Sequence, residues 1–158
     1  MIKAEDLRIG DLVKVCCDCE FPKDTVCIVS EIGTVDVFIR RKGCFGLIPL
    51  SGNDDNGQEV WDDDIEGIPL TPEILELNGW DKRTFKVRFQ KSLRERYVYT
   101  LPSTDLSIEY CPYYSQANER FTMYGDCFKI KHIQYVHELQ HILWALGYNA
   151  QLTYPEEM

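Results

Sequence analysis

Short strand-like segments follow one another at close intervals through the first seventy residues of the chain. They cover residues 12–16, 25–32, 35–41, 47–50 and 60–61. Apolar and β-branched residues dominate them, and turn residues such as Gly33-Thr34 separate them. Such spacing is typical of antiparallel strands joined in a meander or closed into a small barrel. We therefore predict a β-rich region over residues 1–70.

A helix is predicted where this region ends, starting at Pro72 with Thr71 as its N-cap. Further strands are expected at residues 85–89, 97–101, 106–111 and 121–124. Apolar residues then recur at helical spacing from Ile133 to Leu146. This periodicity predicts a final helix.

The fold class that follows from these elements is α+β. The opening segment from Ile9 to Val13 resembles the first strand of SH3-like barrels, which implies a small SH3-like β-barrel or meander over residues 1–70. Residues 71–158 are expected to form a helix and an antiparallel sheet packed by the C-terminal helix. The two regions are either separate domains or parts of one shared core.

The final helix carries the only catalytic signature in the sequence. His137, Glu138 and His141 form an H-E-x-x-H motif, in which two helical histidines bind zinc and the glutamate activates a bound water. Residues four apart lie about 40° apart around a helix, so both imidazoles can reach one cation. The motif predicts a metal site with His137 and His141 as ligands and Glu138 as general base. The other interpretation is a pair of solvent-facing histidines opposite the apolar side of the helix.

A catalytic zinc also needs a third protein ligand. Trp144 and Gly147 occupy the positions at which the extended metzincin motif has Gly and His, so that motif is incomplete. A late H-E-x-x-H helix with an upstream cysteine is similar to the arrangement in peptide deformylases, and this similarity implies Cys111 or Cys127 as the third ligand. Two alternatives therefore stay open: a chain without a cofactor, and a chain with zinc as its cofactor.

Seven cysteines at irregular spacing indicate thiols rather than a disulfide framework. Cys16, Cys17 and Cys19 form a cluster with a C-x-x-C pattern, and Cys27 and Cys44 are the candidates to complete a structural zinc site. The sequence lacks the second close cysteine pair that zinc ribbons have. It therefore favours buried and loop thiols over a metal or redox role.

The sequence contains no apolar run near the roughly 20 residues that a membrane helix needs. Its first residues contain no hydrophobic stretch of the kind found in signal peptides. Its 158 residues and 44% hydrophobic content are ample for a packed core. We expect a soluble cytoplasmic protein with no membrane partner.

Acidic residues concentrate in one segment of the chain. Residues 51–80 hold nine acidic and no basic residues, which equals the net charge of −9 of the whole chain. The interleaved Gly and Asn residues are typical of a solvated loop. Asp62, Asp63 and Asp64 form the predicted contact for a basic partner, unless the segment is a plain acidic surface.

Basic residues concentrate just afterwards. Lys86 and Arg88 alternate with the apolar side chains of residues 85–89, which predicts a strand that buries the apolar side chains and exposes the basic ones. Together with Arg94 and Arg96 they form a predicted basic sheet face. This face is the candidate contact for nucleic acid, although the acidic total counts against binding a polyanion. A solvated face or a pairing with the acidic segment is the other interpretation.

A family resemblance is carried by residues 67–75, 78–80, 135–140 and 145–146. These segments are similar to small proteins of unassigned activity from Bacteroidetes genomes, prophages and mobile elements. That family often has Asn at the position of His141 and Gln at the position of Glu138. The resemblance thus implies a phage or mobile-element origin and a zinc motif without a catalytic role.

Three functional interpretations follow. The first is a non-catalytic protein-interaction module that binds a protein partner through its acidic segment or through the helix face with Trp144. The second is a zinc-dependent hydrolase built on His137, Glu138 and His141. The third is a nucleic-acid-binding accessory protein. The interaction module is favoured because the catalytic set is incomplete.

Overall fold

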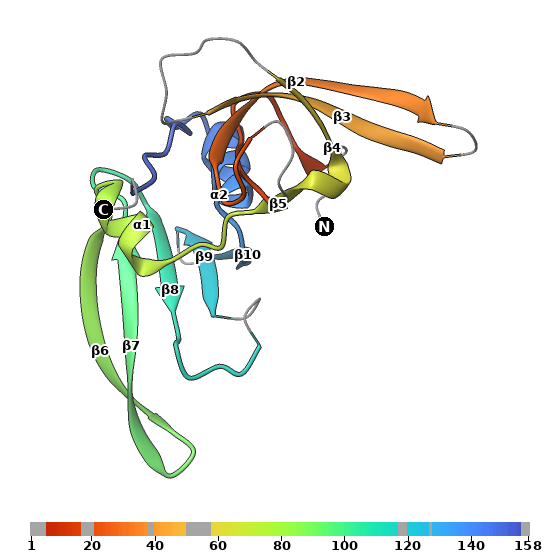
Figure 1. Cartoon of the computed structure of the whole chain (residues 1–158). Helices are drawn as coiled ribbons and strands as arrows, with labels where there is room; N and C mark the ends of the chain where they lie inside the picture. The colour runs from red at the N-terminus through yellow and green to blue at the C-terminus, as the bar shows by residue number, and fades with distance from the viewer. Residues whose placement is uncertain are drawn as a thin grey trace. The chain divides into compact units, whose positions relative to one another are not determined.

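The computed structural model describes residues 6–16, 21–37, 40–49, 58–116, 120–126 and 128–155. The chain divides into two compact units. The first comprises Met1–Ile68 and Leu139–Gln151, and the second comprises Pro69–Glu138 and Leu152–Met158. The described residues form two antiparallel sheets and two α-helices, which confirms an α+β chain (Figure 1).

The first unit contains a five-stranded sheet with the strand order β4-β3-β2-β1-β5. Its elements are β1 (Leu12–Val15), β2 (Val26–Val37), β3 (Arg40–Pro49), β4 (Gln58–Trp61), the 3₁₀ helix η2 (Asp62–Asp64) and β5 (Ile65–Gly67). Strand β1 lies between β2 and β5, pairing Val13 with Cys27 on one side and with Gly67 on the other. The pairings between described residues form an open sheet and close no barrel.

Alternation along the strands builds the core of this unit. Val13 and Val15 of β1 and Cys27 and Val29 of β2 are completely buried, as expected when every second side chain faces the same side of a sheet. They belong to one apolar cluster that also contains Leu7, Phe21, Leu47, Val60 and Ile65. The first unit therefore has its own hydrophobic core.

The long hairpin of β2 and β3 differs from the sequence prediction. Gly33-Thr34 was predicted as a turn, but Gly33 pairs with Cys44 and Thr34 with Gly43 inside the ladder. The pairing continues to Val37, opposite Arg40. A glycine inside a strand keeps its ladder hydrogen bonds, so the tendency of Gly to form turns did not decide the structure here.

The second unit contains another five-stranded antiparallel sheet, with the strand order β10-β9-β8-β7-β6. Its elements are α1 (Pro72–Leu77), β6 (Asp81–Phe89), β7 (Ser92–Thr100), β8 (Leu106–Tyr110), β9 (Phe121–Gly125) and β10 (Phe128–Ile133). The start of α1 is as predicted, because the Thr71 hydroxyl accepts a hydrogen bond from the Ile74 amide and Pro72 is the first helical residue. Ile74 and Leu75 anchor the helix in the core.

One face of the second sheet forms its core. Tyr99, Ile108 and Met123 lie side by side on β7, β8 and β9, and all three are fully buried. Phe85 was predicted to be buried, but it is 42% exposed. Two features explain this exposure. Phe85 lies opposite Arg96 in the ladder, so its side chain is on the face of the sheet away from the buried Tyr99. Among the described residues, β8 pairs with β7 only from Tyr97 onward, so the outer part of β6 and β7 is a two-stranded ribbon (Figure 1).

The last helix, α2 (Val136–Ala145), begins later than the sequence indicated. Ile133, expected in this helix, ends β10, a strand that the sequence analysis did not predict. Val136, Leu139 and Leu143 form the buried side of the helix as expected, whereas Leu146 is 49% exposed. Among the described residues, no helix is long and apolar enough to cross a membrane.

Candidate functional site

A groove of about 620 Å³ lies in the first unit, within the size range of protein binding pockets. It is lined by the loop that precedes β1, by the later turns of α2 and by the segment that follows α2. The lining residues are Arg8, Ile9, Gly10, Asp11, Gln140, His141, Trp144, Tyr148, Asn149, Ala150 and Gln151. We call this the Trp144 groove.

Gln140 fixes the base of the Trp144 groove. Its side-chain oxygen accepts a hydrogen bond from the Leu12 amide at 2.9 Å. Its side-chain nitrogen donates to the carbonyl oxygens of Gly10 and Ala150, both at 3.1 Å. One buried amide thus satisfies three backbone groups, as buried polar side chains require. It holds the loop before β1 and the segment after α2 against the helix.

Gly10 gives the loop its shape. Its φ of +96° lies in the region that side-chain-bearing residues rarely adopt. Its amide donates to the Val29 carbonyl at 2.7 Å, and its carbonyl accepts from Gln140. The glycine therefore allows both hydrogen bonds to form while the adjacent Ile9 side chain is left exposed.

Asp11 and His141 are hydrogen-bonded beside Gln140. Nε2 of His141 lies 2.7 Å from Oδ2 of Asp11, and the same carboxylate oxygen accepts from the Arg8 amide at 2.7 Å. The Asp11 side chain is 4% exposed and the His141 side chain 23%. A buried carboxylate needs such hydrogen-bond partners to replace the water it has lost. The pair therefore has a structural role in holding the groove, with the histidine at its surface.

The sides of the Trp144 groove are apolar and exposed. Ile9 is 70% exposed, Trp144 is 65% exposed and Tyr148 is 39% exposed. The guanidinium of Arg8 lies over the Trp144 ring, 4.5 Å from its centroid, which is a cation–π contact. Large apolar side chains around a groove with a satisfied polar base are characteristic of a binding surface.

Glu138, the predicted general base, has another role in the structure. Its carboxylate accepts hydrogen bonds from the amides of Gln134 and Tyr135, at 2.7 and 3.1 Å, and pairs with Lys131 at 2.7 Å. It therefore supplies the glutamate half of a capping box at the start of α2. Burial raises the pKa of Glu138, but the Lys131 ammonium and the two amides outweigh it, so the pKa lies below its usual value.

The two motif histidines were predicted to lie outside the core, and this is wrong for His137. It is only 5% exposed, and its ring stacks on that of Tyr135 with 5.6 Å between the centroids. The buried arc of α2 is wider than the aliphatic stripe, because Gln140 and His137 on its flank are buried as well. His141, the second predicted ligand, is bound to Asp11 instead of facing open solvent.

The cysteines proposed as metal ligands are placed only in part. Cys111 is buried, donates to a Glu109 carboxylate oxygen at 3.4 Å, and has its pKa raised by burial. Cys16 donates to the Asp63 carbonyl, and its pKa is also raised by burial. Cys17, Cys19 and Cys127 lie outside the described residues. Across the described ranges, no group of three His, Cys, Asp or Glu side chains is arranged to hold a metal ion.

The predicted acidic contact, Asp62, Asp63 and Asp64, forms η2 between β4 and β5. The Asp64 carboxylate accepts a hydrogen bond from the Trp61 amide at 3.2 Å, and the backbone carbonyl of Asp64 accepts one from the Cys16 amide at 2.9 Å. These aspartates thus shape a turn that returns the chain to the sheet. The side chain of Asp62 and all of residues 50–57 lie outside the described structure.

The four basic residues of the nucleic-acid alternative do not share one face. In the register of β6 and β7, Lys86 pairs with Glu95. Because side chains alternate along a strand, Lys86 and Arg88 share a face with Glu95. Arg94 and Arg96, the neighbours of Glu95 in the chain, lie on the opposite face. The predicted basic face is therefore divided between the two sides of the ribbon.

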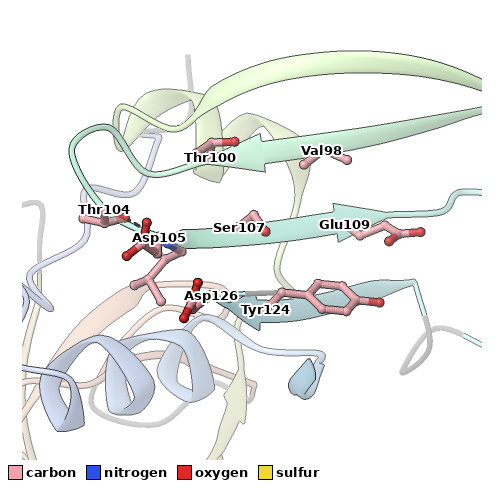
Figure 2. Close-up of a pocket in the computed structure, with 9 residues that line it drawn as sticks. Val98, Thr100, Thr104, Asp105, Ser107, Glu109, Tyr124 and Asp126 are labelled. Carbon is pink, nitrogen blue, oxygen red and sulfur yellow. Dashed lines mark hydrogen bonds between the residues drawn. The ribbon is translucent and has the colours of Figure 1, made fainter. Parts of the chain in front are cut away.

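A second hollow, of about 440 Å³, lies in the second unit on the face of β7, β8 and β9 opposite the core. Its lining residues are Val98, Thr100, Thr104, Asp105, Leu106, Ser107, Glu109, Tyr124 and Asp126 (Figure 2). Several of its polar groups have local partners: the Thr104 hydroxyl donates to the Leu101 carbonyl, and Glu109 pairs with Arg96 at 3.1 Å. These contacts maintain a turn and the sheet surface.

Sequence reasoning found Trp144 in the groove but missed Ile9, Asp11 and Gln140. A glutamine on the apolar side of a predicted helix was the one available signal, because a buried amide implies backbone groups to satisfy. The Trp144 groove is the better candidate for function, since it combines exposed aromatic side chains with a fixed base. The chain matches no protein-family model, no curated protein and no solved structure.

Proposed function

We propose that the chain is a non-catalytic protein-interaction module whose binding surface is the Trp144 groove. The observation that carries this proposal is the exposure of Ile9 and Trp144, 70% and 65%, beside a base whose polar groups are hydrogen-bonded. Tryptophan is the side chain most enriched among the residues that dominate binding energy at protein interfaces. A partner that covers Trp144 would gain on the order of 2 kcal/mol from its burial.

The polar groups around the groove support binding over catalysis. Gln140 uses its side-chain oxygen and nitrogen on three backbone groups, and the Asp11 carboxylate is bound by two donors. Glu138, which a zinc hydrolase would need as its base, caps α2. A fixed, satisfied base is suited to present apolar side chains to a partner at low entropic cost.

The test uses a display library of random linear peptides selected on the immobilised full-length chain. Each enriched peptide is then measured against Trp144→Ala and against Leu93→Ala, a control in which the lost side chain is also 65% exposed but lies in the second unit. Binding should weaken by about 30-fold in the first variant and stay unchanged in the control. Equal binding to both variants and the wild type, or no enrichment at all, would remove the proposal.

The acidic version of the same proposal places the contact on Asp62, Asp63 and Asp64. The role of Asp64 in the turn of η2 argues for the groove instead. Replacing the three aspartates by asparagine keeps side chains that can accept hydrogen bonds and removes the charge. The selected peptides should bind this variant as they bind the wild type, whereas loss of binding would transfer the site to the acidic turn.

We also propose that the first unit is an SH3-like, partly open barrel. Two observations support this: β1 pairs with both β2 and β5, which brings the first and last strands of the unit together, and a 3₁₀ turn precedes β5. Amide hydrogen exchange tests it. Slow exchange along the outer edges of β4 and β5 is expected if they are covered, and fast exchange there would favour an open sheet.

A further inference from the structure

The ionisable side chains of the Trp144 groove differ in their contacts. Three ionisable side chains other than tyrosine line it, namely Arg8, Asp11 and His141. Asp11 and His141 bind each other at 2.7 Å. The Arg8 guanidinium lies on the Trp144 ring and forms no ion pair with any residue that the structure describes. The groove thus presents a guanidinium that pairs with no carboxylate of the described residues, while the Asp11 carboxylate is buried and hydrogen-bonded to His141 and to the Arg8 amide.

The position of this cation is fixed by two contacts. The Arg8 backbone amide donates to Asp11, and its guanidinium stacks on the indole 4.5 Å away. A guanidinium held on an aromatic ring keeps its outer N–H groups available for a carboxylate. Ile9, the next residue, is 70% exposed. A ligand in the groove would therefore meet apolar surface and a fixed cation together.

Resting on the proposed function, we propose that the Trp144 groove binds an acidic, hydrophobic peptide segment. An apolar side chain of the segment packs against Ile9 and Trp144, and a neighbouring Asp or Glu pairs with Arg8. Charge complementarity selects this occupant over a basic or neutral peptide, which would leave Arg8 without a partner. A nucleic acid is disfavoured because its binding takes several phosphate contacts, and Arg8 is the only lysine or arginine among the described residues that line the groove.

The experiment uses peptides from the display selection that depend on Trp144, each synthesised together with a twin in which every Asp and Glu is replaced by Asn and Gln. Affinities are measured by fluorescence anisotropy on the full-length wild-type chain, on Arg8→Gln and on Arg88→Gln as a control for loss of one positive charge. The acidic peptide should bind the wild type and Arg88→Gln about 10-fold more tightly than its twin. Arg8→Gln should bind both peptides equally. The advantage of the acidic peptide should shrink between about 0.1 M and about 1 M salt.

The outcomes separate the two proposals. Peptides that depend on Trp144 but bind as well as their amide twins would overturn the acidic specificity and leave the interaction module standing. A selection that yields no Trp144-dependent peptide would overturn both. Displacement of a bound acidic peptide by a single-stranded oligonucleotide at low concentration would overturn the choice of a peptide over a nucleic acid. Urea unfolding of Arg8→Gln, expected to match the wild type, checks that the variant is folded.

Discussion

His141 and Asp11 lie 130 positions apart in the chain, and their side chains are hydrogen-bonded at 2.7 Å. The Asp11 carboxylate is buried, so loss of its partner leaves a charge with one donor fewer. We expect Asp11→Ala and His141→Ala each to lower the free energy of unfolding by about 2 kcal/mol. In a double-mutant cycle followed by urea unfolding, the coupling energy should be about 1 kcal/mol. A coupling energy of zero would show that the pair contributes nothing to stability.

The stability of the chain should depend on the amide group of Gln140, even when a replacement keeps the size of the side chain. Gln140→Leu has similar volume but leaves the Leu12 amide and two carbonyls without their side-chain partner, at a cost of about 2 kcal/mol. Gln140→Glu keeps the acceptor for Leu12 but sets a carboxylate against the carbonyls of Gly10 and Ala150. We expect it to be less stable than Gln140→Leu at neutral pH. Urea midpoints of the two variants compare them directly, and equal stability to the wild type would contradict the burial of this amide.

The lowered pKa of Glu138 should make the stability of the chain depend on pH. Its pKa is lower in the folded chain than its ordinary value of 4.5, so its contribution is fully present above that value. The contribution is lost as the pH falls through the lower pKa of the folded state. Glu138→Ala should therefore be about 1 kcal/mol less stable than the wild type at pH 7, and the difference should vanish under strongly acidic conditions.

Glu138→Gln is the matched variant for this prediction. Glutamine still accepts hydrogen bonds from the amides of Gln134 and Tyr135 but loses the charge that pairs with Lys131. At pH 7 its stability should lie between those of the wild type and Glu138→Ala. Because glutamine does not titrate, position 138 should add little to the pH dependence of stability between pH 7 and pH 3. Thermal unfolding across that range measures it. A stability profile that is the same in all three proteins would rule out the capping role.

The H-E-x-x-H motif can be tested by elemental analysis of protein purified without a histidine tag. Because Glu138 caps α2 and His141 binds Asp11, we expect the metal content of the wild type and of His137→Ala/His141→Ala to be the same. Zinc bound in near-stoichiometric amount to the wild type and lost from the double mutant would establish the metal site and revive the hydrolase interpretation. Zinc retained by both proteins would instead indicate the cysteines as the zinc ligands.

Sequence patterns predicted those elements whose signals are local. The start of α1 is an example, because Thr71 and Pro72 act on their own helix within one turn. The strand β10 was missed because Ile133 fits equally well as the last residue of an alternating strand and as the first of a helical stripe. The cap of α2 was missed because the residue before the helix is Tyr135, which is not a favoured N-cap.

The candidate site depends on contacts that no local pattern records. Asp11 looks like an ordinary loop residue, and only the fold brings it to His141. Gln140 was placed on a helix correctly, but its three backbone partners come from segments 10 to 130 positions away. Trp144 was identified because an exposed tryptophan follows from the helical period alone. The apolar sides of the groove were thus partly predictable, whereas its polar base was not.

The first unit is discontinuous in the chain, because Leu139–Gln151 complete what Met1–Ile68 begin. A ribosome must therefore synthesise the entire second unit up to Glu138 before Gln140 can reach the Leu12 amide. Until then, the Leu12 amide lacks Gln140 and the Asp11 carboxylate lacks His141 in the nascent chain. A polypeptide terminated after residue 70 should consequently be a poor folding unit and a good chaperone substrate, although it contains every strand of its sheet.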